Sequence, residues 1–143
     1  SGGNFHRISR VMLHNPEGKI LLQKRTSNVV FPNCWDNSAS GHVDEGEDYL
    51  VAAKREMLEE IGVKDVVLEE VDYYKREEDF GEYVLRRFNK LYKGTIDFTP
   101  TDLGLDEVSE VRWFSLDEIK DLIKDHPDEV TGGLKYIIQK YYK

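Results

Sequence analysis

Cysteine is nearly absent from this sequence of 143 residues, in which Cys34 is the only one. A single cysteine excludes an internal disulfide and a metal site built from cysteines. Nothing near Cys34 is an evident base, so we interpret it as a packing residue beside Trp35 rather than as a nucleophile. Long apolar runs are absent as well. No stretch approaches the roughly 18 apolar residues that a membrane helix needs, and we expect no membrane partner.

Positive charge is also scarce, since 20 Lys and Arg are outnumbered by 28 Asp and Glu, for a net charge of −8. Broad nucleic-acid binding depends on a basic surface that neutralises phosphates, so we expect no nucleic-acid partner. An anionic small-molecule substrate would need metal ions and a few well-placed cations. The N-terminus lacks the residue order of a secretory signal, and we expect a cytoplasmic protein, either a monomer or a homodimer.

What is present is a mixture of strand and helix patterns in a chain of one-domain length, and we expect a single domain over residues 1–143. Residues 8–13 and 19–24 predict a hairpin around the turn Asn15-Pro16-Glu17-Gly18. Further strands are predicted at 35–43, at 66–74 and 83–92, which are joined through a polar tip at 77–81, and at 108–114. Helices are predicted at 48–61, from the capping-box signal Ser115-Leu116-Asp117-Glu118 to before Pro127, and at 130–142. This order predicts an α/β (α+β) fold, with a mixed sheet covered by helices on both faces.

The predicted helix over residues 48–61 carries one apolar stripe, which indicates that one of its faces packs on a core. The stripe consists of Leu50, Ala53, Met57 and Ile61. Gly62 follows the last of them and is the expected end of the helix.

Three acidic residues of this helix have i, i+3 and i+4 spacing, so we expect the carboxylates of Glu56, Glu59 and Glu60 to converge on one edge. Like charges at this spacing repel each other, and a bound hard cation is the simplest way to offset the repulsion. Mg²⁺ fits, because it takes oxygen ligands and bridges protein carboxylates to substrate phosphates. On the triplet alone, an ordinary solvated acidic face is the more common explanation of these residues.

The surrounding residues decide between these interpretations. The order is Gly41, five residues, Glu47, seven residues, Arg55-Glu56, Met57, one residue, Glu59-Glu60, one residue, Gly62 and Val63. At ordinary residue frequencies such an order arises by chance with odds on the order of one in 10⁷. It resembles the signature of the Nudix superfamily at every position, and we refer to residues 41–63 as the Nudix box.

The resemblance implies an α/β/α sandwich and assigns roles within the box. Glu56, Glu59 and Glu60 resemble the divalent-metal ligands, for Mg²⁺ or alternatively Mn²⁺. Arg55 and Glu47 resemble the pair that orients them. Gly41 and Gly62 resemble hinges of the loops that flank the helix.

The implied reaction is metal-assisted attack of water on a phosphorus atom, with Glu56, Glu59, Glu60 and Arg55 as the catalytic set. The proton of that water needs a carboxylate acceptor. Glu59, Glu60 or an acid from the later loop at 102–110 can fill this role, and the sequence does not choose among them.

Substrate contacts are expected from arginines and aromatic residues. Arg25 and Arg87 are candidate phosphate ligands, and since consecutive strand residues face opposite sides, at most one of Arg86 and Arg87 faces the site. A surface position explains each of them as well. Trp35 is a candidate platform for a base or prenyl group, as are Phe31, Tyr83 and Trp113, although an aromatic residue in a strand is usually part of the core.

A second resemblance is to type 1 isopentenyl diphosphate isomerases, a non-hydrolytic branch of the same superfamily. It rests on residues 6–25 followed by Phe31-Pro32, Trp35, Asn37-Ser38 and Gly41-His42. In that branch, histidines matching His6 and His42 help to bind a metal, and a cysteine stands where this chain has Ser40. A hydroxyl is a poor acid–base group without an activator, so the comparison favours hydrolysis. A structural role for the two histidines remains the alternative.

Three hypotheses follow. The first is a magnesium-dependent pyrophosphohydrolase that cleaves a diphosphate linkage in a nucleoside diphosphate derivative or related organic diphosphate. The second is an isomerase-like activity on isopentenyl diphosphate, and the third is a nucleotide-binding module without turnover.

Overall fold

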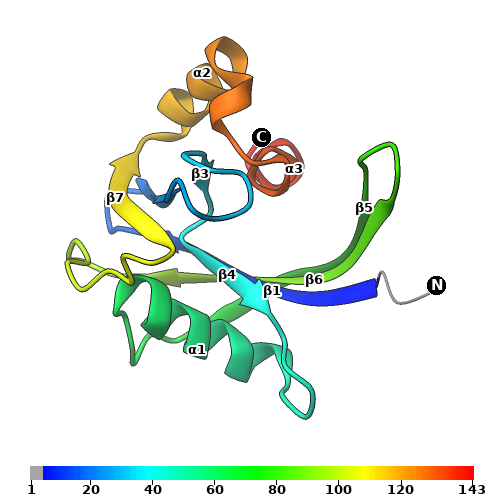
Figure 1. The fold of residues 1–143 in the computed structure, drawn as a ribbon. Coiled ribbons are helices and arrows are strands. Elements are labelled where there is room, and N and C mark those ends of the chain that lie inside the picture. The colour runs from blue at the N-terminus through cyan, green and yellow to red at the C-terminus, as the bar shows by residue number, and fades with distance from the viewer. Residues whose placement is uncertain (1–4) are drawn as a thin grey trace.

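The computed structural model describes residues 5–143, which form a mixed sheet between helices (Figure 1). The strands are β1 (Phe5–His14), β2 (Ile20–Arg25), β3 (Trp35–Asp36), β4 (Ala39–His42), β5 (Glu69–Asp79), β6 (Val84–Thr95) and β7 (Val108–Phe114). The helices are α1 (Tyr49–Ile61), α2 (Leu116–Asp125), the short 3₁₀ helix η2 (Pro127–Glu129) and α3 (Gly132–Tyr141). The predicted fold class, α+β with a mixed sheet, is confirmed.

Strand β1 organises the sheet because it pairs with three other strands. It runs parallel to β6 along its length, from Phe5 opposite Arg86 to His14 opposite Thr95. Residues 8–11 also pair with β4, whereas Leu13 and His14 pair with β2. Strand β5 extends the sheet beyond β6, and β3 and β7 pair with β2. Because β2 and β4 pair with different segments of β1, they separate from each other, and both contribute residues to the cavity described below.

The predicted turn between β1 and β2 is present and locally stabilised. The side-chain Oδ1 of Asn15 accepts hydrogen bonds from the backbone N–H groups of Glu17 at 3.1 Å and Lys19 at 2.9 Å. Gly18 adopts φ 86°, a left-handed conformation that glycine tolerates without strain.

Helix α1 matches the predicted range of 48–61 to within one residue and ends at the predicted glycine. Asp48 caps its start by accepting from the N–H of Val51, and Gly62 ends it with φ 68°. The predicted apolar stripe is wrong at one position, since Leu50 is 37% exposed whereas Ala52 is buried. The buried face of α1 also includes Glu60, so this face is rotated around the helix relative to the predicted stripe and excludes Leu50.

Several other boundaries differ from the prediction. The single strand expected at 35–43 is two strands, because buried Asn37 and Ser38 interrupt it and Ser38 Oγ donates to the carbonyl of Leu21 at 2.6 Å. Strand β5 begins at residue 69 rather than 66 and continues through most of the expected polar tip. Helix α2 has the predicted capping box of Ser115 and Glu118.

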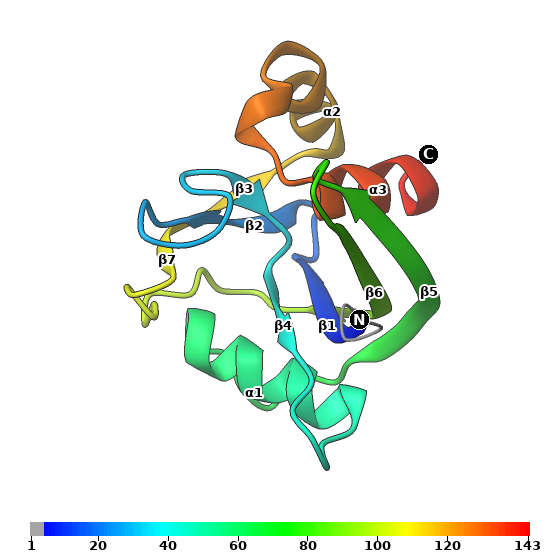
Figure 2. The same cartoon turned by 45° about the vertical axis from the view of Figure 1, so that its right-hand side comes forward.

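The core consists of two clusters, one on each face of the sheet. Successive residues of β1, Val11 and Met12, are both fully buried but belong to opposite clusters, as the alternation of a strand requires. Helix α1 covers one face, and α2 and α3 cover the other (Figure 2). Trp35 lies in the cluster on the face covered by α2 and α3. It is 4% exposed and edge-on to Phe114, with 5.0 Å between the ring centroids. The prediction that Trp35 is a substrate platform is therefore wrong, and the core alternative holds.

No helix within residues 5–143 is long and apolar enough to cross a membrane.

Candidate metal and diphosphate site

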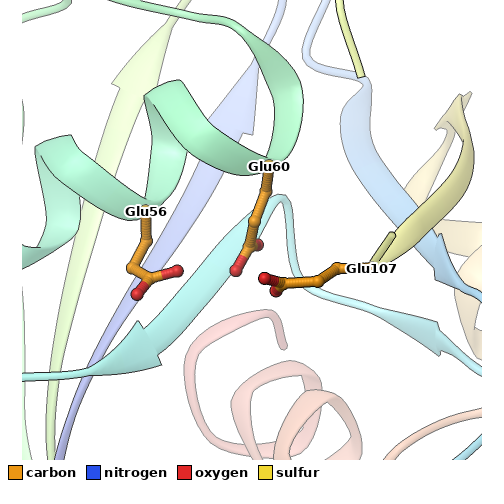
Figure 3. Close-up of side chains that lie close together, drawn as sticks. All are labelled: Glu56, Glu60 and Glu107. Atoms are coloured by element: carbon orange, nitrogen blue, oxygen red, sulfur yellow. The ribbon is translucent and has the colours of Figure 1, made fainter. Parts of the chain in front are cut away.

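Three carboxylates from two parts of the chain face one another at the end of α1. Glu56 and Glu60 come from the helix, and Glu107 comes from the loop that precedes β7 (Figure 3). One oxygen of each lies within 4.8 Å of the others. Glu59, the third glutamate expected to converge, lies outside this cluster: its side chain is 54% exposed and approaches Arg55 Nη1 at 3.5 Å. Glu56 and Glu60, four residues apart, share a helix face, whereas Glu59 lies roughly 100° around the helix from Glu60.

Glu60 is 4% exposed and is held by two donors, Gln23 Nε2 at 2.7 Å and the backbone N–H of Ser40 at 3.2 Å. Burial and the neighbouring Glu56 raise the pKa of Glu60 well above the usual glutamate range. The pKa of Glu107 is raised too, by burial and by the charges of Glu56 and Glu59. Crowded carboxylates that resist ionisation are stabilised by a divalent cation, so these donors fit the hard, oxygen-seeking Mg²⁺ expected from the sequence.

Two glycines bring the three carboxylates together through close packing. A Cβ on Gly41 would lie 2.2 Å from the carboxyl carbon of Glu56, so only glycine admits this side chain against β4. Gly41 lies within a strand, and the prediction that it is a loop hinge is wrong. A Cβ on Gly62 would lie 2.5 Å from the carbonyl oxygen of Asp102. Gly62 thus ends α1 and also admits the loop that carries Glu107.

Arg55 and Glu47 are paired, as the resemblance implies. Arg55 Nε donates to Glu47 at 2.8 Å, its Nη1 to Glu56 at 2.7 Å and its Nη2 to the carbonyl of His42 at 3.0 Å. Hydrogen bonding from Arg55 lowers the pKa of Glu47 to about 2, so the pair stays ionised at neutral pH. Arg55 fixes the carboxylate of Glu56 and is best described as a positioning residue.

We expect Arg55→Lys to lower kcat/KM by about 10- to 100-fold, because one ammonium cannot replace a planar fork that holds three acceptors. The affinity for Mg²⁺ should fall as well, which calorimetry measures directly. Lys54→Arg, at the exposed neighbouring position, is the matched control. If Arg55→Lys matches the wild type in both measurements, positive charge alone is sufficient there.

Cationic groups line the same cavity of about 520 Å³. Arg87 faces it, whereas Arg86 pairs with Glu77 at 3.3 Å outside it, so the expectation that at most one of the two faces the site is confirmed. Arg25 also lines it, donating to the carbonyl of Val30 at 2.7 Å.

Arg10, which was not among the predicted site residues, lines the cavity from the middle of β1 and is only 5% exposed. The available signal was a charged residue in the middle of a predicted strand, directly before the apolar run of residues 11–13. His6 and His42 line the cavity with ring centroids 5.2 Å apart, outside the three-carboxylate cluster.

The cavity mouth is aromatic. Phe31 and Tyr83 line it, and Phe80 bridges them with ring-centroid distances of 6.3 Å and 5.3 Å. Phe31 adopts φ 55°, a conformation that bulky residues rarely take. Trp113, another aromatic candidate, instead packs on the α1 side of the sheet.

Cys34 donates to the carbonyl of Asp128 at 3.5 Å, and burial raises the pKa of its thiol. A thiol that resists ionisation is a weak nucleophile, in agreement with the packing interpretation.

A helix that presents carboxylates to a cavity lined with arginines is the arrangement of an enzyme that acts on phosphorus-containing acid anhydrides. The family model of the NUDIX domain matches residues 4–133. The chain belongs to the Nudix family, and it is a hydrolase of the branch that resembles type 1 isopentenyl diphosphate isomerases.

Two relatives and one solved structure illustrate this placement. A prenyl-diphosphate phosphatase of Methanosarcina mazei is 33% identical over 147 aligned residues, which cover 100% of this chain and 83% of the relative. Isopentenyl-diphosphate Delta-isomerase 2 of Photorhabdus laumondii is 31% identical, over 95% of this chain and 77% of the relative. The crystal structure of DR0079 from Deinococcus radiodurans is similar with a TM-score of 0.83 over 96% of this chain and 83% of that chain, at 23% identity, which shows the fold alone.

Proposed function

We propose that this protein hydrolyses the P–O–P linkage of an organic diphosphate with the help of a divalent cation, Mg²⁺ or Mn²⁺. The observation that carries the proposal is the placement of opposite charges around one cavity. The carboxylates of Glu56, Glu60 and Glu107 suit a cation, and the guanidinium groups of Arg25 and Arg87 suit phosphate oxygens.

Glu56, Glu60 and Glu107 would hold the cation, which when bound polarises phosphoryl oxygens and lowers the pKa of water. Glu107 also takes the role of proton acceptor in the proposal. Its carboxylate is the most exposed of the three and has a raised pKa, which suits a general base. The new bond joins the water oxygen to phosphorus, the bridging P–O bond breaks, and the proton of the water passes to Glu107. The products are an organic monophosphate and inorganic phosphate.

The organic group of the substrate would lie at the aromatic mouth. Phe31 and Tyr83 offer faces on which either a nucleobase or a prenyl chain can pack. The name of the Methanosarcina mazei relative, which is similar over the whole of this chain, supports a prenyl diphosphate, and a nucleoside diphosphate derivative is the other candidate.

A hydrolysis screen tests the proposal. Purified protein is incubated with Mg²⁺, with Mn²⁺ or with a chelator, against nucleoside diphosphates, sugar nucleotides, dinucleoside polyphosphates and prenyl diphosphates. We expect phosphate release that requires the metal, with one oxygen derived from labelled water in the products. Turnover in the presence of chelator, or no hydrolysis of any diphosphate, would contradict the proposal.

The same incubations test the isomerase alternative, which the relative from Photorhabdus laumondii keeps in view. Isopentenyl diphosphate is included, and the products are examined for the allylic isomer. Ser40 lines the cavity but offers only a hydroxyl, so we expect no isomer.

A further inference from the structure

Arg10 is a buried cation without an ion-pair partner among the described residues. Its side chain is 5% exposed and bonds two neutral amides, Asn89 Oδ1 at 2.8 Å and Asn37 Oδ1 at 3.1 Å. No carboxylate among residues 5–143 forms an ion pair with it, although ion pairs are common elsewhere on the protein. Burying an unpaired charge is costly, and such groups are normally paired or bind a ligand. Arg10 lines the cavity, so a ligand there can supply the missing negative charge.

Two carboxylates that line the same cavity are already engaged. Asp36 lies 3.6 Å from Arg25 and accepts a hydrogen bond from Thr131 at 2.9 Å. Glu78 lies 3.6 Å from Arg87 and forms a closer ion pair with Arg76. Neither neutralises Arg10.

The start of α3 adds positive potential at the same place. A Cβ on Gly133 would lie 2.7 Å from Arg10 Nη1, and one on Gly132 would lie 2.8 Å from Arg76 Nη2. Glycine therefore lets the first turn of this 10-residue helix approach two guanidinium groups. The N–H groups of a first turn have no intrahelical acceptor and carry partial positive charge. Cations and a helix start packed this closely repel each other, and an anion bound beside them in the cavity would offset the repulsion.

Arg87 supplies a further unmet donor. Its Nε is buried and has no hydrogen-bond partner within the described residues. Burial and the positive charges of Arg10 and Arg76 lower the pKa of Arg87, which agrees with an excess of positive charge at this end of the cavity.

The cavity is closed at this end and open at the other. Asn37 and Asn89 behind Arg10 are 0% exposed, whereas Val30 and Tyr83 at the mouth are 67% and 52% exposed. A ligand at Arg10 must therefore be compact, and any bulky group attached to it must extend toward the mouth.

We propose that Arg10, Arg87 and the first turn of α3 form a binding subsite for the terminal, unesterified phosphate of the substrate. This inference rests on the proposed diphosphate hydrolysis and narrows its substrate class. A subsite at the closed end accepts an organic diphosphate that ends in a free phosphate. It excludes diphosphates that carry an organic group at both ends.

A binding measurement on the metal-free protein tests the subsite separately from turnover. Inorganic diphosphate is titrated into chelator-treated protein and followed by calorimetry and by the melting temperature. We expect saturable binding to the wild type, and affinity lower by about 10- to 100-fold in Arg10→Gln, because a charged hydrogen-bond donor is lost. Arg10→Lys, which keeps the charge but not the fork, should lie between them.

Arg86→Gln is the matched control, since Arg86 neighbours Arg87 but pairs with Glu77 outside the cavity. It should bind inorganic diphosphate like the wild type. Should Arg10→Gln fail to fold, Arg87→Gln tests the same subsite at a less buried position, with the same expected loss. Unchanged affinity in a folded Arg10→Gln or Arg87→Gln variant, or no binding by the wild type, overturns the subsite.

Substrate preference gives a second readout. The wild type should have at least tenfold higher kcat/KM for a diphosphate with a free terminal phosphate than for one capped at both ends, such as a sugar nucleotide. Arg10→Gln should reduce this ratio mainly through KM. Equal use of both substrate types by the wild type overturns the subsite while leaving diphosphate hydrolysis intact. Binding of inorganic diphosphate through Arg10 without hydrolysis of any diphosphate leaves the subsite intact and contradicts the proposed function.

Discussion

Replacing Glu60 by glutamine should lower kcat by about 10³-fold or more, because it removes a charged ligand from the centre of the proposed cation site. The fold should persist, since a glutamine oxygen can still accept the hydrogen bonds from Gln23 and Ser40. The metal-free variant should melt at a higher temperature than the wild type. The raised pKa of Glu60 means that its ionised form destabilises the metal-free fold at neutral pH, and glutamine carries no charge. Steady-state rates and thermal unfolding, each with and without Mg²⁺, measure both effects.

Glu59→Gln is the matched control for Glu60→Gln, and it separates the structural assignment from the sequence prediction. Glu59 is mostly exposed, and its nearest charged partner is Arg55 at 3.5 Å. We expect its rate to stay within a few-fold of the wild type and its stabilisation by Mg²⁺ to be unchanged. A loss as large as that of Glu60→Gln would show that all three helical glutamates act together, as the residue order alone implies. A near-normal rate in Glu60→Gln would show that the cation does not bind at α1.

The parts of the fold that sequence reasoning predicted are those set by local chemistry. The turn at Asn15, the capping box at Ser115 and the glycine that ends α1 each act within a few residues, and each is present. The parallel pairing of β1 with β6 joins residues about 80 positions apart and has no local signature. The pairing of β2 and β4 with different segments of β1 has no local signature either, and the separation of these two strands shapes the cavity.

The site shows the same division. Glu56 and Glu60 are close because they are one helical turn apart, which the sequence specifies. Glu107 joins them only because Gly62 admits its loop against the end of α1, a contact that depends on the whole fold. Arg10 is similar: its position in β1 was predicted, but only the tertiary structure shows that β1 faces the start of α3 there. Trp35 was misjudged because an apolar aromatic residue suits a core and a ligand platform equally well until its neighbours are known.

Gly41→Ala should lower kcat by about 100-fold, even though the added methyl group carries no charge. Its Cβ would lie 2.2 Å from the carboxyl carbon and 2.5 Å from one oxygen of Glu56. No real Cβ contact is that short, so either the carboxylate leaves the cation site or β4 shifts away from α1. Displacement of a preorganised ligand by about 1 Å costs about this much in rate. The measurements are kcat with Mg²⁺, the Mg²⁺ affinity and the free energy of unfolding.

A double-mutant cycle with Glu56→Ala identifies the cause. If the methyl group acts by collision with the Glu56 carboxylate, Gly41→Ala should destabilise the wild type clearly but have little effect on the free energy of unfolding in the Glu56→Ala background. An equal loss in both backgrounds would instead place the strain in the β4 backbone. Gly46→Ala serves as a comparison, because nothing lies within 4 Å of its Cβ, and it should leave kcat near the wild-type value despite φ 82°. Near-normal activity and Mg²⁺ affinity in Gly41→Ala would mean that Glu56 reaches the cation from a position other than the one against β4.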